Sequence, residues 1–153
     1  MTGPAAVPLA RLMGMGFRLL IDDLHDRLAA QGWRDIRPAY GFALLAIRDG
    51  ETTTTELARL LGVTKQATSK LLDAMERRRL VRRRASDDDA RTKVVALAPR
   101  GHELLAAVEL IYADLEAEWA EVIGPTAVEQ TRTRLERVLR ARHGGELPQL
   151  RPA

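Results

Sequence analysis

The segment of residues 54–72 constrains the fold most, because it contains two short amphipathic helices separated by a single glycine. Gly62 stands between the helices, where a left-handed backbone costs a glycine little. Ala58 is small where the two helices would cross closely, and Thr64 can cap the second helix through its hydroxyl. The apolar positions expected to be buried are Leu57, Leu61, Val63, Leu71 and Leu72. This pattern predicts a helix-turn-helix.

The residues on either side of this segment extend the motif. Thr53 and Glu56 have the spacing of a capping box, in which hydroxyl and carboxylate each satisfy an exposed backbone N–H group. After Leu80 the helical periodicity stops, and residues 81–85 and 92–97 are expected to form two strands joined by a charged loop. A hairpin directly after a helix-turn-helix is a wing.

Further helices are expected before and after this module. Their ranges are residues 9–31, a second helix from Pro38 to Asp49, residues 100–123 and residues 126–142. The predicted fold class is mainly α (α+β). It has a flexible leader at 1–8, one domain at 9–142 with its winged helix-turn-helix at about 36–98, and a disordered tail at 143–153.

Composition limits the compartment and the partners. The chain has no cysteine, which excludes disulfides and thiolate sites and suits a reducing compartment. No stretch approaches the roughly 18 to 20 apolar residues of a membrane span, so we expect a cytoplasmic protein without a membrane partner. Residues 64–100 hold 11 of the 24 Lys and Arg residues but only 5 of the 21 Asp and Glu residues. Such a concentrated cationic segment is typical of a nucleic-acid binder, although a solvated helix can look the same.

The outer face of the second helix of the motif is polar. Lys65, Gln66, Ser69 and Lys70 lie there by period. Gln and Lys can read base edges in a major groove, and Ser and Thr can hold phosphates. Double-stranded DNA is therefore the predicted partner, and the competing interpretation is a solvated amphipathic helix pair.

Enzymatic motifs are missing from the sequence. There is no HExxH, no phosphate loop and no nucleophile elbow, so we expect no enzyme, no catalytic residues and no cofactor. The consecutive carboxylates Asp87, Asp88 and Asp89 lack further ligand spacing, and we expect no metal.

Residues 56–101 resemble the multiple-antibiotic-resistance regulator (MarR) family, and the order of the predicted elements matches that family over about residues 9–142. The likeness is carried by residues 56–76 (ELARLLGVTKQATSKLLDAME), by Leu80-Val81, by residues 89–97 (DARTKVVAL) and by Gly101. The resemblance implies a recognition helix that presents Thr64, Lys65, Gln66, Ser69 and Lys70. It also implies an Asp-x-Arg wing signature at Asp89 and Arg91, in which Arg91 reaches the minor groove and Asp89 helps to orient it, while Lys93 supports the adjacent backbone.

Several positions depart from the family pattern or leave alternatives open. Thr68 stands where the family often has Val or Ala, and it is either core or a DNA contact. Ser86 and Ala90 replace a frequent Asp and a frequent Arg of the wing. The arginines in the runs 77–79 and 82–84 either hold phosphates or pair with residues 87–89. Of these arginines, only Arg84 is included among the predicted DNA contacts.

The terminal helices carry apolar stripes that the winged module cannot cover alone. They include Val122, Ile123, Val128, Leu135, Val138 and Leu139, and a two-fold homodimer would bury them; the alternative is a monomer folded on itself. The resemblance implies dimerisation through these helices and a pocket for a small aromatic effector. Its candidate lining residues are Phe17, Trp33, Tyr40, Phe42 and Tyr112, although aromatic residues at such positions more often belong to an ordinary core.

The predicted function is therefore a sequence-specific transcription regulator, a ligand-responsive repressor that binds a pseudo-palindromic operator as a homodimer. The alternative is a winged-helix module that binds DNA with little sequence preference or binds a protein.

Overall fold

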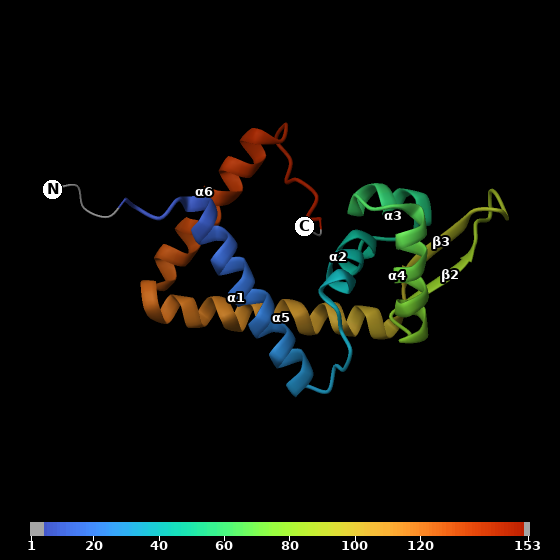
Figure 1. Ribbon diagram of the computed structural model, residues 1–153, viewed down its shortest axis with the longest axis horizontal. Helices are drawn as coiled ribbons and strands as arrows, with labels where there is room; N and C mark the ends of the chain where they lie inside the picture. Colours follow the sequence, from blue (N-terminus) through green and yellow to red (C-terminus); the bar gives the residue numbers. More distant parts are fainter. Residues whose placement is uncertain (1–4, 152–153) are drawn as a thin grey trace.

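A computed structural model describes residues 5–151, and Figure 1 shows an elongated molecule with a winged lobe at one end and crossing helices at the other. In chain order the elements are α1 (Leu9–Ala30), α2 (Pro38–Ile47), β1 (Thr52–Thr53), α3 (Thr54–Leu61), α4 (Lys65–Arg77), β2 (Val81–Ala85), β3 (Lys93–Leu97), α5 (Pro99–Ile123) and α6 (Pro125–Arg142). The predicted mainly helical fold with a winged helix-turn-helix is confirmed, and the expected helices and strands end within two residues of the observed ones.

The three strands form one antiparallel sheet in the order β1-β3-β2. β2 pairs with β3 from Val81 opposite Leu97 to Ala85 opposite Lys93, as the predicted wing requires. β1, which the sequence analysis did not predict, places Thr52 opposite Val95 and Thr53 opposite Val94. A two-residue strand is too short to show an alternating pattern, so only its partner identifies it.

The hydrophobic core joins the winged lobe to the long helices. Leu44, Leu57, Leu72 and Met75 of α2, α3 and α4 are fully buried beneath the sheet, together with Val95. Leu24 and Leu28 of α1 and Leu104, Ile111 and Leu115 of α5 extend the same cluster. The helix-turn-helix and helices α1 and α5 are therefore parts of one packed unit.

The start of α5 is packed tightly against the chain that leads into the wing. The Ala98 N–H donates to the Leu80 carbonyl at 3.0 Å, just before α5 begins. Gly101 is buried one turn later, and a Cβ at this position would overlap the Leu80 carbonyl oxygen. Only glycine therefore allows α5 to approach the end of the helix-turn-helix this closely.

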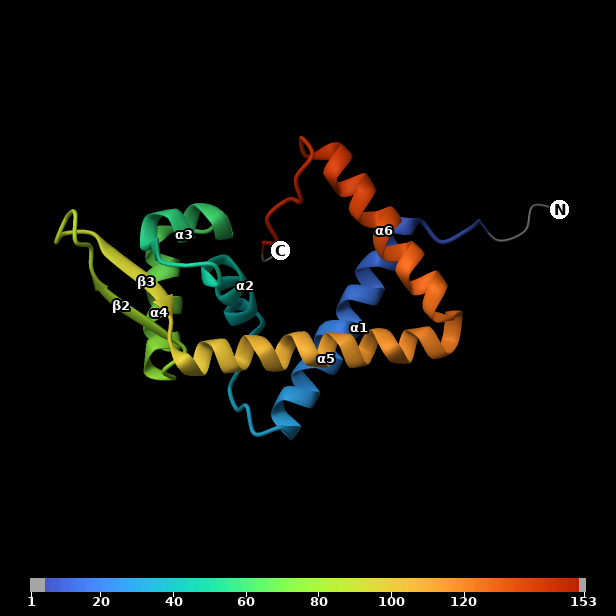
Figure 2. The ribbon, with the colours of Figure 1, turned by 180° about the vertical axis from the view of Figure 1, so that it is seen from behind.

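Helices α1, α5 and α6 form the other end of the molecule. Figure 2 shows that α1 crosses α5 and that α6 turns back after α5. The reversal takes place at Gly124, whose φ is 87°. Arg132 of α6 bonds both oxygens of Glu116 of α5, at 3.1 and 2.5 Å, and this bond holds the pKa of Glu116 below its usual range. No residue of α6 is buried, so this helix has an uncovered face.

The two ends of the chain extend beyond the helices. Residues 5–8 and 147–151 contain no helix or strand, and the C-terminal segment returns towards α2 and α3 (Figure 1). The flexible leader and the disordered tail stay predictions, and residues 1–4 and 152–153 lie outside the described part. Within residues 5–151, no helix is long and apolar enough to cross a membrane.

Candidate nucleic-acid interface

The turn between α3 and α4 has the geometry that the sequence predicted. Gly62 ends α3 in the left-handed conformation, with φ 69° and ψ 29°. The Thr64 hydroxyl accepts from the Ala67 N–H at 3.0 Å and caps α4. The Thr53 hydroxyl likewise accepts from the Glu56 N–H at 3.0 Å. The Glu56 carboxylate bonds Arg59 instead of reaching back to Thr53, so only half of the predicted capping box forms, and this pairing lowers the pKa of Glu56.

The outer face of α4 presents most of the predicted contact residues to solvent. Thr64, Lys65, Gln66 and Lys70 are exposed and Ser69 is half-buried. Thr68 does not belong to this face. It is fully buried, and its hydroxyl donates to the Thr64 carbonyl at 2.9 Å, so the core alternative describes it and it has no surface to offer a base.

Val63 is more exposed than predicted, whereas Thr68 is more buried than a DNA contact would be. Val63 was expected in the core by helical period, but 40% of its surface is exposed. The reason is that Val63 follows Gly62 in the turn, where the helical period that predicted burial does not apply.

The first half of α4 and the wing together line a shallow polar concavity. Of the predicted contacts, Lys65, Ser69, Arg91 and Lys93 meet there. Residues 53–55, at the N-terminus of α3, complete this concavity and were not predicted as site residues. The sequence feature that could have identified them is the run of four threonines. Threonine hydroxyls at the N-terminus of a helix suit a phosphate.

Asp89 shapes the wing turn through the backbone. Its Oδ1 accepts from the Arg91 N–H at 3.0 Å, and its Oδ2 accepts from the Thr92 hydroxyl at 3.4 Å. Asp89 thus fixes the chain that carries Arg91 and leaves the Arg91 side chain exposed.

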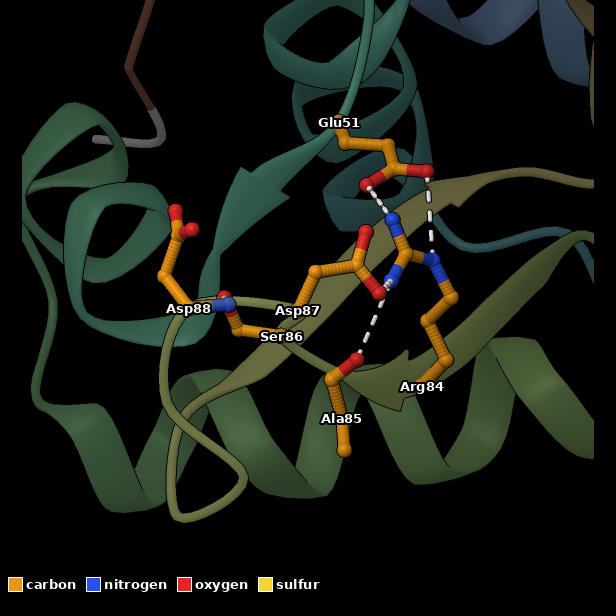
Figure 3. A network of polar contacts seen from close by, with 6 residues as sticks. All are labelled: Glu51, Arg84, Ala85, Ser86, Asp87 and Asp88. Atoms are coloured by element: carbon orange, nitrogen blue, oxygen red, sulfur yellow. Dashed lines mark hydrogen bonds and ion pairs between the residues drawn. The ribbon is translucent and has the colours of Figure 1, made fainter.

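Arg84, also predicted to contact DNA, is held by carboxylates (Figure 3). Its Nη2 lies 2.7 Å from Glu51 Oε2, and its Nη1 lies 3.2 Å from Asp87 Oδ1. The hydrogen bonds that Arg84 donates to the Glu51 carboxylate are the main reason that the pKa of Arg84 is raised. The structure therefore favours the ion-pair alternative for Arg84 in the absence of DNA.

Arg83 is also paired, and it joins the wing to α4. Its Nη2 lies 2.5 Å from Asp73 Oδ1 and 3.1 Å from Glu76 Oε1. Among the residues that the structure describes, Arg82 has no carboxylate within ion-pair distance and is exposed. Arg83 is the member of this run that reaches α4, because side chains alternate between the two faces of β2 and Arg82 and Arg84 lie on the other face.

An apolar pocket lies between α1, α2 and α5. Of the five candidate effector-pocket residues, Phe17, Phe42 and Tyr112 line this pocket, and burial raises the pKa of the Tyr112 hydroxyl. Trp33 and Tyr40 do not. Tyr40 is fully buried with Arg37 5.1 Å from its ring centroid, and Trp33 lies under Arg100 at 4.6 Å. For these two aromatics the core alternative is correct.

These elements define a winged helix-turn-helix protein: a capped helix pair with an exposed polar second helix and an arginine-bearing hairpin beside it. A family model described as the MarR family matches residues 34–92. Over these residues the winged helix-turn-helix is thus similar to the MarR family, and the whole chain has the fold of E. coli MarR.

Solved structures support this assignment. Wild-type MarR from E. coli in its apo form has 25% sequence identity and a TM-score of 0.74, with 89% of this chain and 99% of that chain covered. A mutant of E. coli MarR complexed with operator DNA has 27% identity and a TM-score of 0.67, covering 87% and 94%. A mutant of MepR from S. aureus bound to an oligodeoxyribonucleotide has 24% identity and a TM-score of 0.62, covering 89% and 99%. Among curated proteins, no match was found.

Proposed function

We propose that this protein is a transcription regulator that binds double-stranded DNA through α4 and the wing. The observation that carries the proposal is the cationic concavity where Lys65, Arg91 and Lys93 meet beside the exposed face of α4. Lys65, Gln66 and Lys70 would face base edges in a major groove, and Arg91 would enter the adjacent minor groove. The E. coli MarR structure with operator DNA supports this assignment by fold and family. We propose no catalytic activity, cofactor or metal, and a cytoplasmic location remains a prediction.

The proposed working form is a homodimer. Large apolar side chains stay exposed on α1, on the second half of α5 and on α6, and Val122 is 84% exposed. Burying them against a second copy would place two α4 helices on one side of a duplex, about 34–36 Å apart, and would require a pseudo-palindromic site.

The apolar pocket supports a further part of the proposal, namely that the protein is a ligand-responsive repressor. The pocket lies where α1 and α5 pack on the winged lobe, and Phe17, Phe42 and Tyr112 suit a small aromatic molecule. Such a ligand would release DNA only if it bound better to a state in which the two α4 helices no longer match the operator.

Selection of bound duplexes from random DNA, followed by affinity measurements at several salt concentrations, tests the function. Lys65→Ala or Gln66→Ala should reduce the difference in affinity between selected and random duplexes, because base readout is lost. If the affinity for both duplexes falls equally, that residue does not read bases. If the unchanged protein binds selected and random duplexes equally, a module with little sequence preference is the better description.

The wing has a separate test. Arg91→Ala should weaken binding to the selected duplex by about 1–3 kcal/mol and reduce any preference for A·T flanks. Arg34→Ala is the matched control, because Arg34 is exposed in the loop between α1 and α2. Equal affinities for both variants would remove the wing from the interface.

A further inference from the structure

The C-terminal segment contacts the winged lobe through its last two described residues. The Arg151 Nε donates to the Leu60 carbonyl at the end of α3, at 3.1 Å. Leu150 lines the apolar pocket between α1, α2 and α5. Figure 2 shows the segment leaving the end of α6 and returning towards α2 and α3. Arg151 thereby joins residues 91 positions apart in the sequence.

Two glycines at the end of α6 direct the segment back. Gly144 and Gly145 have φ values of 65° and 94°, in the region that other residues rarely adopt. The Gly145 N–H donates to the Arg140 carbonyl at 2.8 Å, and Arg140 Nη1 donates to the Gly145 carbonyl at 3.3 Å. These glycines therefore do more than end α6, since they reverse the direction of the chain.

The end of α3 is suited to receive an arginine. Gly62 and Val63 donate their N–H groups to the Arg59 and Ala58 carbonyls, whereas the Leu60 carbonyl is bonded by the Arg151 guanidinium. A positive charge is favourable at this negative end of the helix dipole. Gly62 also leaves room for it, because a Cβ there would stand only 3.3 Å from Arg151 Cδ.

Leu150 contacts a surface made almost entirely of apolar side chains. The pocket is lined by the buried Leu24, Leu28, Leu44 and Leu104 and by the partly exposed Phe17, Phe42 and Tyr112. Leu150 keeps 49% of its surface exposed, so it covers the mouth of the pocket and does not fill it. An apolar molecule that enters there would compete with Leu150 for the same walls.

We propose that the pocket mouth and the α3–α4 turn form one binding site for the chain's own Leu150 and Arg151. In the resting protein Leu150 closes the pocket, and Arg151 completes the last turn of α3. A small apolar molecule that takes the pocket displaces Leu150, and because the two residues are adjacent, Arg151 leaves Leu60 with it. Occupation of the pocket is thereby coupled to the turn that positions α4. This inference is independent of DNA binding.

Binding of the fluorescent apolar anion 8-anilinonaphthalene-1-sulfonate to the full chain tests the pocket half of the proposal. Leu150→Ala, or truncation after Glu146, should tighten dye binding by about three- to tenfold, since half of one leucine's burial no longer opposes it. Leu147→Ala is the matched control, because Leu147 is 47% exposed in the same segment and does not line the pocket. Unchanged affinity after truncation, or an equal gain in Leu147→Ala, would overturn this half.

Amide hydrogen exchange at Gly62 and Val63 tests the other half. Arg151→Ala should speed exchange at these two amides severalfold, because the last turn of α3 loses its cap. Saturating dye should have the same effect on the full chain and no added effect on the truncated chain. Exchange that neither Arg151→Ala nor the dye alters would refute the coupling. Neither measurement contains DNA, so failure here leaves the proposed DNA-binding function in place.

Discussion

Thr64 shows how one residue fixes the start of the helix that would read DNA. Its hydroxyl caps the Ala67 N–H, one of the four N–H groups that a helix start leaves without a partner. We predict that Thr64→Ala lowers the free energy of unfolding by about 1 kcal/mol in urea titrations. Thr133→Ala, at an exposed position inside α6, is the control and should be neutral or slightly stabilising. Equal losses in the two variants would show that the cap is not the cause.

The ion pair between Glu51 and Arg84 gives a second prediction for a single residue. It neutralises Arg84 in the free protein, so Glu51→Gln should release Arg84 for a phosphate. The plot of log binding constant against log salt should then steepen by about one unit. Glu146→Gln, which removes the same charge from an exposed position of the tail, should leave the slope unchanged. A slope that is the same in all three proteins would mean that Arg84 stays with Asp87 or faces away from DNA.

Individual residues were predictable where the cause is local. The Thr64 cap and the left-handed Gly62 depend on neighbours within four positions, and both are confirmed. The pairing of Arg84 with Asp87 was one of two alternatives, whereas its pairing with Glu51 was not predicted, because Glu51 lies 33 positions away and is brought close by β1. Thr68 was ambiguous for another reason: its hydroxyl finds a backbone partner inside its own helix, so a polar side chain could be buried at little cost.

Among the elements, the contact between the start of α5 and the end of the helix-turn-helix is the most sensitive. We predict that Gly101→Ala destabilises the protein by about 3 kcal/mol or more, since its Cβ would overlap the Leu80 carbonyl. Gly14→Ala in α1 has no atom within 4 Å of its Cβ and should stabilise by up to about 1 kcal/mol. Thermal unfolding of both variants checks this contrast. A Gly101→Ala protein as stable as the original would mean that α5 can shift away from Leu80 at little cost.

Elements were predictable to the degree that they repeat a pattern. Helices of 8 to 25 residues show apolar periodicity and carry capping residues, so all six were found. β1 has two residues and no period, and its existence depends on β3 more than 40 positions later. Because β1 was not predicted, the contribution of residues 53–55 to the polar concavity was not predicted either.

At the scale of the whole molecule, the exposed apolar face predicts self-association. Val122→Glu combined with Val138→Glu places charges on this face, where both side chains are largely exposed. We expect the unchanged protein to sediment as a dimer and the double variant as a monomer, with much weaker binding to a two-half-site duplex. Leu147→Glu in the tail is the control and should stay dimeric. A monomeric unchanged protein would contradict the proposed homodimer.

The arrangement of the whole molecule was the least accessible from sequence. Apolar stripes indicated that α1, α5 and α6 need partners, but not that α1 would cross α5 or that the C-terminal segment would reach α3 (Figure 2). Trp33 and Tyr40 were expected at the pocket, but neither lines it: Tyr40 is fully buried in the core, and the Trp33 ring packs against Arg100. Such contacts form between segments far apart in the chain, where no local pattern records them.

The central strand of the sheet continues through a single residue, Ala98, into a helix of 25 residues. At 1.5 Å per residue that helix is about 37 Å long, so a tilt of about 5° at one end corresponds to a movement of about 3 Å at the other. If α5 tilted about the junction near Leu80, the hairpin and the distant end of α5 would therefore move together. In the proposed homodimer, a change in the angle between the two copies would move both wing tips, and the distance between the tips would report that angle.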